Sequence, residues 1–300
     1  MKASNAVGLV SIGVPYFDAP TAEAYLKETR ALLERRWTVY GPDKMITDKP
    51  ALEETIERFL TQERVDVLII QIGTFPDGEA PLTLAERLRV PIIVHSLPEP
   101  DLAQEVGLNS FCGANLTTYT LTAMDYPHTS LHGDPRRPEV LEALEAQVRA
   151  ALALADMKRS RLGLVGFRAP GFYPCVFDEL LLRRQLGMAL DYIDLDAVKQ
   201  AFQTGRRKQA PQQRFLTTDG GELSAQAVAW MEQHYAALTE VLANNEFDLF
   251  AVRDWPELFD VDAPGGVWPA LGWLLDDGYL LAPEGDVNSA VTMKLAHNLT

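Results

Sequence analysis

Short, almost entirely apolar segments alternate along this chain with longer amphipathic ones, and this alternation limits the folds open to it. Residues 65–71 and 91–95 are rich in β-branched side chains, which predicts strands buried on both faces. Between them, residues 81–88 show helical periodicity. Strands that alternate with helices predict a parallel sheet covered by helices. The expected class is therefore α/β, with a Rossmann-like or flavodoxin-like layout.

The pattern occurs twice, which predicts two such units. In the first, further strands are expected at 7–13, 37–40 and 129–132, and helices at 21–35, 51–61, 113–124 and 139–157. After the polar stretch 157–161, the second has expected strands at 161–166, 189–193, 247–253 and 279–282, and helices at 176–186, 197–202, 223–244, 267–275 and 290–300. A polar, basic segment at 203–218 predicts an exposed loop. We expect an N-terminal α/β domain at 1–158 and a central α/β domain at 159–300.

Composition excludes several kinds of partner. The net charge of −15 argues against nucleic acid and anionic membranes as binding partners. No apolar run approaches the roughly 18 residues of a membrane span, and the N-terminus lacks the apolar core of a signal peptide. The two cysteines, Cys112 and Cys175, are too few for a disulfide framework and suggest a reducing compartment. We therefore expect a cytoplasmic protein, with Cys112 as a small buried thiol.

Carboxylates gather at predicted strand ends in the second unit. Glu284 and Asp286 lie between the apolar run 279–282 and a helical pattern, and Glu257 follows the predicted strand 247–253. In open parallel sheets, ligand sites gather at this end of the strands. Several carboxylates from different elements are what a hard divalent metal needs. The structural alternative is that Glu284 and Asp286 stabilise the helix N-terminus, a role that suits Asp286 well.

These motifs resemble the L-arabinose/L-fucose isomerase superfamily. The resemblance is carried by Glu284-Gly285-Asp286, by Pro256-Glu257-Leu258 upstream and by Asn109-Ser110-Phe111-Cys112-Gly113-Ala114-Asn115. Glu257 and Glu284 lie 27 positions apart, about the separation of the two metal-binding glutamates in the arabinose branch. The family continues into a C-terminal β-rich domain, which supplies a metal-binding histidine. That domain is expected to be absent here, either because the chain is a fragment or because it is a natural short form.

The resemblance implies a metal-dependent aldose–ketose isomerase that acts through an enediol on a small sugar such as L-fucose, L-arabinose or a related pentose or 6-deoxyhexose. Mn²⁺ or a similar divalent ion is the implied cofactor, with Glu257, Glu284 and Asp286 as candidate ligands. Asp286 is the second choice to Glu284, since the fucose branch uses the third residue of this turn. Glu257 and Glu284 are also the candidate acid–base pair. The implied assembly is a homo-oligomer in which Asn115 and His128 contact substrate in a neighbouring subunit.

Other interpretations remain open. The chain could be a non-catalytic sugar-binding or assembly module, or a different metal-dependent sugar enzyme on the same scaffold. Gly163, Gly166 and Gly171 do not have the spacing of a dinucleotide-binding loop and are explained by close backbone approach. Among the remaining histidines, His132 is expected to have a substrate or structural role near the sheet edge. His95 and His234 are expected to be structural, and His297 is expected at the surface or an interface.

Overall fold

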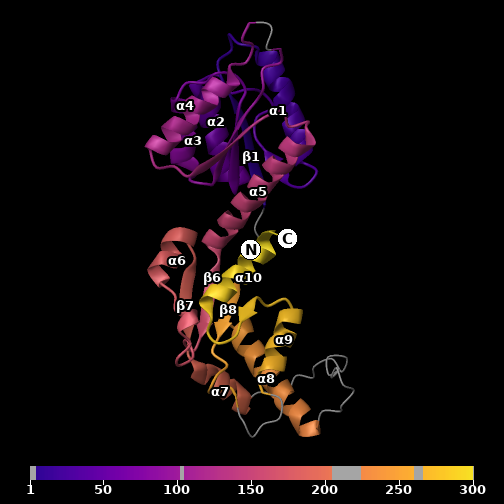
Figure 1. The fold of residues 1–300 in the computed structure, drawn as a ribbon, viewed down its shortest axis with the longest axis vertical. Coiled ribbons are helices and arrows are strands. Elements are labelled where there is room, and N and C mark those ends of the chain that lie inside the picture. Colours follow the sequence, from indigo (N-terminus) through magenta and orange to yellow (C-terminus); the bar gives the residue numbers. More distant parts are fainter. Residues whose placement is uncertain (1–4, 102–104, 205–223, 260–265, 300) are drawn as a thin grey trace. The chain divides into compact units, whose positions relative to one another are not determined.

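The computed structural model describes residues 5–101, 105–204, 224–259 and 266–299. The chain divides into two compact units, Met1–Asp156 and Met157–Thr300, and each has its own parallel sheet (Figure 1). The α/β class with two helix-covered parallel sheets is confirmed. The division lies within helix α5 (Pro138–Arg159), as does the domain boundary expected after residue 158.

Unit 1 contains a five-stranded parallel sheet in the order β2-β1-β3-β4-β5. This is the flavodoxin-like strand order, in which successive strands are added on one side of β1 and then, from β3 onward, on its other side. The strands are β1 (Ala6–Ile12), β2 (Thr38–Tyr40), β3 (Val67–Ile72), β4 (Ile92–Ser96) and β5 (His128–His132). The other helices are α1 (Ala19–Leu33), α2 (Lys49–Arg58), the π-helical turn η1 (Phe59–Glu63), α3 (Glu79–Leu88) and α4 (Ser110–Ala123).

Alternate residues of these strands enter two separate cores. On one face, Val7 and Leu9 pack with side chains of α1 and α5. On the other, Val10 and Ile12 pack with side chains of α2, α3 and α4. Every residue of β3 is buried, as its continuous apolar run predicted.

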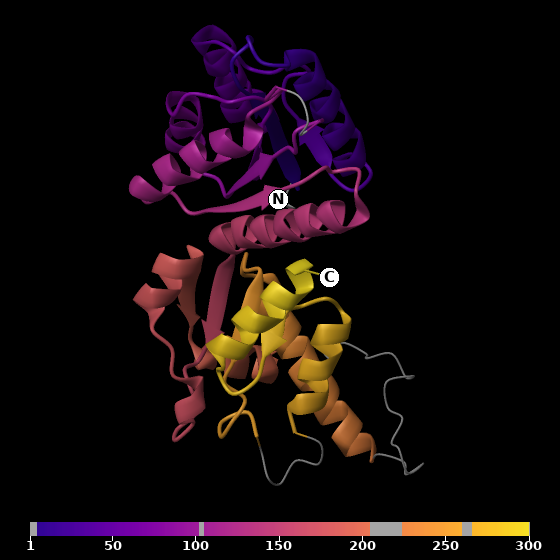
Figure 2. The same ribbon diagram turned by 45° about the horizontal axis from the view of Figure 1, so that its top comes forward.

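Unit 2 contains a four-stranded parallel sheet in the order β7-β6-β8-β9. The strands are β6 (Arg161–Val165), β7 (Ala189–Ile193), β8 (Leu249–Val252) and β9 (Leu281–Ala282). The helices are the 3₁₀ turn η2 (Tyr173–Cys175), α6 (Glu179–Leu186), α7 (Leu195–Thr204), α8 (Ala225–Ala243), α9 (Trp268–Asp276) and α10 (Val287–Leu299). Helices α7, α8 and α9 share one core with the sheet. Helix α10 packs on β8 and β9 from the other face (Figure 2).

Several element boundaries differ from the sequence expectation for local reasons. The helix expected from residue 176 begins at Glu179, because Asp178 caps it and accepts a hydrogen bond from the Leu181 N–H at 2.9 Å. The second helix of the chain continues past Arg58 as the π-helical turn η1. Of the basic loop expected at 203–218, residues 205–218 lie outside the described residues, and 203–204 end α7. None of the described helices is long and apolar enough to cross a membrane.

Gly113 lets α4 approach β3 closely. A Cβ atom there would lie 2.4 Å from Pro76 Cδ and 2.8 Å from Ile72 Cγ2. Gly113→Ala should therefore lower the free energy of unfolding of unit 1 by about 1–3 kcal/mol through overpacking.

Gly272 in α9 provides the matched control. A Cβ atom at Gly272 would meet nothing within 4 Å. Gly272→Ala should stabilise its helix by up to about 1 kcal/mol, because alanine has the higher helix propensity. Urea unfolding of both variants measures the two effects, and equal shifts of the same sign would contradict the packing argument.

Candidate functional site

The carboxyl ends of β6, β8 and β9 lie side by side at one edge of the unit 2 sheet. Three chain segments follow these strands: 166–168 after β6, 253–258 after β8 and 283–286 after β9. Ligand sites in open α/β sheets gather at this edge. Glu257, Glu284 and Asp286 all lie in these segments, as the sequence suggested.

The turn after β9 has a tightly packed backbone. Glu284 and Gly285 both adopt positive φ angles, 63° and 68°. The Gly285 N–H donates to the Val252 carbonyl at 2.9 Å, and the Ala169 N–H donates to the Glu284 carbonyl at 3.3 Å. A Cβ atom on Gly285 would lie 2.5 Å from the Phe167 carbonyl oxygen, so no side chain fits there. The turn is thereby bonded to the ends of both β8 and β6.

Asp254 is the residue that sequence reasoning missed. It is 1% exposed, its Oδ1 accepts the Glu284 N–H at 2.7 Å, and its Oδ2 accepts the Trp268 indole N–H at 2.5 Å. A buried carboxylate needs such donors to remain stable. The available signal was its position two residues after the last residue of β8, where an acid in a parallel sheet faces the ligand edge.

Glu284 has a perturbed acidity. Its pKa is raised, first by partial burial and then by the negative charges of Asp254 and Asp286. No described residue donates a hydrogen bond to its side chain. A carboxylate with a raised pKa that keeps its oxygens free is suited to carry a proton.

Asp286 caps the following helix. Its Oδ1 accepts the Ser289 N–H at 3.0 Å and its Oδ2 accepts the Ser289 hydroxyl at 2.6 Å. Both of its oxygens are thus engaged at the start of α10. This is the structural role that the sequence allowed as an alternative to metal binding.

Glu257 lies on the turn after β8 and forms an ion pair with Arg253, four residues earlier. The Arg253 side chain passes close to Gly166, where a Cβ atom would lie 3.0 Å from Arg253 Cβ. Glu257 is not among the charges that raise the Glu284 pKa. The structure therefore places Glu257 at the same edge, but the group of interacting acids is Asp254, Glu284 and Asp286.

The donor chemistry suits a divalent metal, although the ligand shell is incomplete. In the part of the chain that the structure describes, no three His, Cys, Asp or Glu side chains form a group that could hold a metal ion. The carboxylates present are nevertheless the oxygen donors that hard divalent ions prefer. A cation would also offset the negative charge that Asp254 and Asp286 exert on Glu284.

A pocket of about 240 Å³ is lined in part by Phe167 and Arg168, whose backbone lies against Gly285 of this turn. Its lining residues are Phe167, Arg168, Cys175, Val176, Phe177, Glu179 and Tyr192. The pKa of the Cys175 thiol is raised by burial and by the charges of Asp286 and Glu284, so the pocket wall lies within electrostatic reach of the acidic turn. Sequence reasoning did not identify this pocket, because its residues come from three separate segments.

In unit 1, the two proposed substrate contacts lie on different elements. Asn115 is exposed in the second turn of α4. His128 is the first residue of β5, at the amino edge of the sheet, and its Nδ1 lies 2.9 Å from the Tyr126 carbonyl oxygen. His132, at the opposite end of β5, lies at the carboxyl edge, where its Nδ1 is 2.9 Å from Ser96 Oγ. One expectation was wrong: Cys112 is exposed, because the sheet-facing side of α4 carries Gly113 and Ala114 instead.

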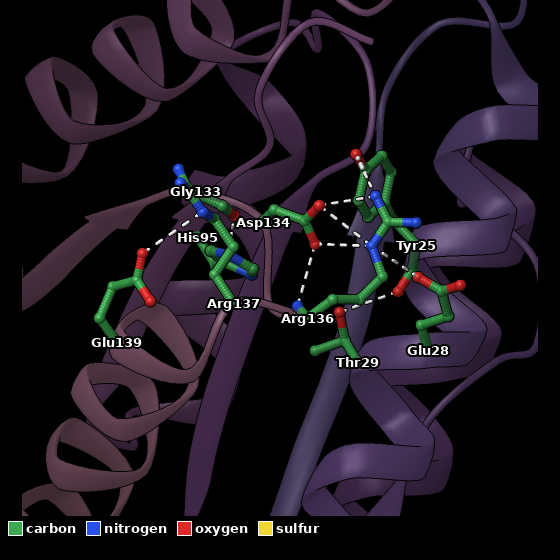
Figure 3. A network of polar contacts seen from close by, with 9 residues as sticks. All are labelled: Tyr25, Glu28, Thr29, His95, Gly133, Asp134, Arg136, Arg137 and Glu139. Atoms are coloured by element: carbon green, nitrogen blue, oxygen red, sulfur yellow. Dashed lines mark hydrogen bonds and ion pairs between the residues drawn. The ribbon is translucent and has the colours of Figure 1, made fainter.

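His95 is a fully buried member of a polar network at this edge (Figure 3). Its Nε2 donates to the Gly133 carbonyl at 3.0 Å, and burial lowers its pKa to about 4. Beyond Gly133, Arg136 forms an ion pair with Asp134 at 2.6 Å, lies 3.5 Å from Glu28 Oε2 and stacks over the Tyr25 ring at 4.9 Å. These contacts fix the turn between β5 and α5.

Next to His95 in the sheet lies a row of buried polar side chains. Ser11, Gln71 and His95 are paired in register on β1, β3 and β4, and all are fully buried. Within the described parts of the chain, no hydrogen-bond partner is found for Ser11 Oγ, for either polar atom of the Gln71 amide or for His95 Nδ1. Buried polar atoms without protein partners are commonly satisfied by ordered water.

Comparison with known proteins agrees with the sequence resemblance. Residues 16–158 match the family model described as fucose/sulfoquinovose isomerase, N-terminal domain. The chain is 26% identical over 298 residues to sulfoquinovose isomerases from Priestia megaterium (strain ATCC 12872 / QMB1551) and Priestia aryabhattai, covering 97% of this chain and 66% of each relative. A sulfoquinovose isomerase from Alkalicoccus urumqiensis is 26% identical over 290 residues, covering 95% of this chain and 64% of that protein.

These matches establish distant homology. Residues 16–158 match a fucose/sulfoquinovose isomerase N-terminal domain, and the chain is distantly homologous to sulfoquinovose isomerases. The family resemblance is thereby confirmed. The chain spans less than two thirds of the length of these relatives.

Asp254→Asn should destabilise unit 2 by about 2–4 kcal/mol, because an amide can accept only one of the two N–H groups and turns its own N–H toward the other. The same change removes a negative charge beside Glu284, so the Glu284 pKa should fall toward its ordinary value. Urea unfolding and a carboxyl NMR titration measure the two effects. Asp178→Asn, at the exposed cap of α6, is the control and should be nearly neutral. A stable Asp254→Asn protein would contradict the role assigned to this carboxylate.

Stability should fall as the pH is lowered through the acidic range. The pKa of His95 is about 4 in the folded unit, below the 6.5 of a free histidine. Between these two pH values His95 is mostly protonated in the unfolded chain but mostly neutral in the folded unit, so lowering the pH favours unfolding. Between these two values the loss should reach about 3 kcal/mol.

The matching experiment is urea unfolding at about pH 7 and pH 5 for the wild-type chain, His95→Gln and His234→Gln. Each substitution should reduce the change in unfolding free energy between the two pH values, because burial lowers the pKa of both His95 and His234. This change is compared rather than absolute stability, since both histidines are buried. A change in His95→Gln as large as in the wild-type chain would contradict the assignment.

Proposed function

We propose that this chain carries the acid–base part of an aldose–ketose isomerase that acts on a small sugar. The observation that supports this most directly is the Glu284 carboxylate, which has a raised pKa and lies on a backbone turn anchored by Asp254 at the ligand edge of the sheet. The distant homology to sulfoquinovose isomerases supports the same reaction class.

The proposed reaction moves a proton from C2 to C1 of the open-chain sugar through an enediol. One group must take a proton and one must return it, which requires carboxyls that can change protonation state at the working pH. Glu284 is the proposed carrier, because its raised pKa favours proton uptake. Glu257 is the proposed second group, and its ion pair with Arg253 holds it on the same edge.

Mn²⁺ or a similar divalent ion is the proposed cofactor, with Glu257, Glu284 and Asp286 as the ligands in this chain. When bound, such an ion would polarise the carbonyl and the neighbouring hydroxyl of the sugar. Its binding would require Glu257 to release Arg253 and Asp286 to share oxygens that now cap α10. A further donor would have to come from outside the described residues.

The substrate is proposed to be a pentose or a 6-deoxyhexose, with or without a charged substituent. L-fucose and L-arabinose follow from the family resemblance. The name of the relatives points instead to a sulfonated sugar. A substrate panel should therefore contain both kinds.

We further propose a homo-oligomer in which Asn115 and His128 of one subunit contact the sugar bound by its neighbour. Asn115 is exposed on α4 and available for such a contact. His128 lies at the amino edge of the sheet, so this assembly would have to bring that edge to the neighbour as well. The mass of the chain in solution tests whether an oligomer forms.

The alternative is a non-catalytic sugar-binding or assembly module. The absence of a three-donor metal group among the described residues favours it. Sugar binding without turnover would support this non-catalytic function.

Glu284→Gln should abolish ketose formation, with at least about a hundredfold loss of kcat/KM, because the amide cannot carry the proton. The assay measures ketose formation from L-fucose, L-arabinose and a 6-sulfonated 6-deoxyhexose, with and without Mn²⁺. Glu240→Gln, on the exposed end of α8 in the same unit, is the control and should retain activity. Full activity in Glu284→Gln, in a variant that unfolds like the wild type, would overturn the proposed role.

A further inference from the structure

The pocket beside the acidic turn has a mainly apolar wall and one arginine. Phe167 and Tyr192 stack with ring centroids 6.4 Å apart, and Val176 and Phe177 add further apolar surface. Arg168 is the only cation among the lining residues. Pockets of this kind bind small molecules, with a few polar groups to fix the orientation of the ligand.

One nitrogen of the Arg168 guanidinium, Nη1, has no hydrogen-bond partner among the described residues. This nitrogen is shielded from solvent. Among the described residues, no carboxylate forms an ion pair with Arg168, and its guanidinium carbon lies 5.7 Å from the centre of the Tyr173 ring. A buried donor without an acceptor costs free energy, so an acceptor supplied by a ligand would stabilise this arrangement.

The acids near the pocket are engaged elsewhere or face the turn. Glu179 Oε2 accepts the Tyr192 hydroxyl at 3.2 Å. Asp286 caps α10, and Asp254 holds the Glu284 N–H and the Trp268 indole. Glu284 keeps free oxygens but is not paired with Arg168. The positive charge of Arg168 therefore remains available to a ligand.

We propose that Arg168 binds an anionic group of the sugar, a sulfonate, phosphate or carboxylate, and thereby sets a preference for charged over neutral substrates. This inference rests on the proposed sugar-binding function of the same edge. Arginine suits the task, because its planar fork can give two parallel hydrogen bonds to such a group.

The backbone connects this anion site to the acidic turn. Arg168 precedes Ala169, whose N–H donates to the Glu284 carbonyl, and its Cα would lie 3.1 Å from a Cβ atom on Gly285. A sugar held by its anionic end at Arg168 would thus be fixed relative to Glu284. In a chain with a net charge of −15, a local cation is also needed to offset repulsion of an anion.

The test is equilibrium binding to the full chain by titration calorimetry in the presence of Mn²⁺. The four probes are 6-deoxyglucose, its 6-sulfonated derivative, glucose 6-phosphate and glucuronate, which separate the three kinds of anion from the neutral sugar. The wild-type chain should bind at least one anionic probe about tenfold tighter than 6-deoxyglucose. Arg168→Gln should abolish that preference and leave the affinity for 6-deoxyglucose unchanged. Arg168→Lys should keep part of the preference for the anionic probe, because lysine retains the positive charge but cannot donate two parallel hydrogen bonds.

Arg184→Gln, on the exposed surface of α6, is the matched control and should behave like the wild type. The inference is overturned if Arg168→Gln keeps the preference for the anionic probe, or if the wild-type chain has no such preference. Isomerisation is measured in parallel. A preference that depends on Arg168 without turnover would sustain this inference while removing the proposed catalysis. If Arg168→Gln lowered turnover equally for charged and neutral sugars, the proposed catalysis would stand and the anion-binding role of Arg168 would be overturned.

Discussion

The hydrogen bonds accepted by the buried Asp254 carboxylate hold the candidate site together. One oxygen binds the Glu284 N–H after β9, and the other binds the Trp268 indole at the start of α9. A carboxylate in this position ties two loops to the end of β8. Its charge also acts on Glu284, whose pKa it helps to raise. The same residue thus shapes the turn and tunes its chemistry, as is common where titratable groups converge.

The turn depends equally on backbone conformation. Gly285 has no room for a side chain against the Phe167 carbonyl, and Glu284 accepts a positive φ angle next to it. A non-glycine residue in this region carries strain of order 1 kcal/mol or more, which the surrounding hydrogen bonds must offset. The turn thereby packs against the Phe167–Arg168 backbone, and both of these residues line the neighbouring pocket.

Much of the fold could be predicted because its strands are buried on both faces. The continuous apolar run of β3 left no doubt about its environment, and helix amphipathicity identified α1 and α8 within a few residues. Predicted helix boundaries were wrong where a side chain hydrogen-bonds to the backbone, as where Asp178 caps the start of α6. Burial within a helix was also misjudged: Cys112 is exposed because its neighbours Gly113 and Ala114 take the sheet-facing positions.

By itself, the sequence determined the α/β class, the two units, the family resemblance and the presence of Glu257, Glu284 and Asp286 at strand ends, because periodicity and motif spacing are local properties. Only the tertiary structure showed that Asp254, rather than Glu257, interacts with Glu284. It also showed that Arg168 lines a pocket without an anionic partner among the described residues. Such relations join residues that are 30 positions apart, as for Asp254 and Glu284, or more than 100, as for Cys175 and Asp286. They depend on how parallel strands align at one edge, which no local pattern encodes.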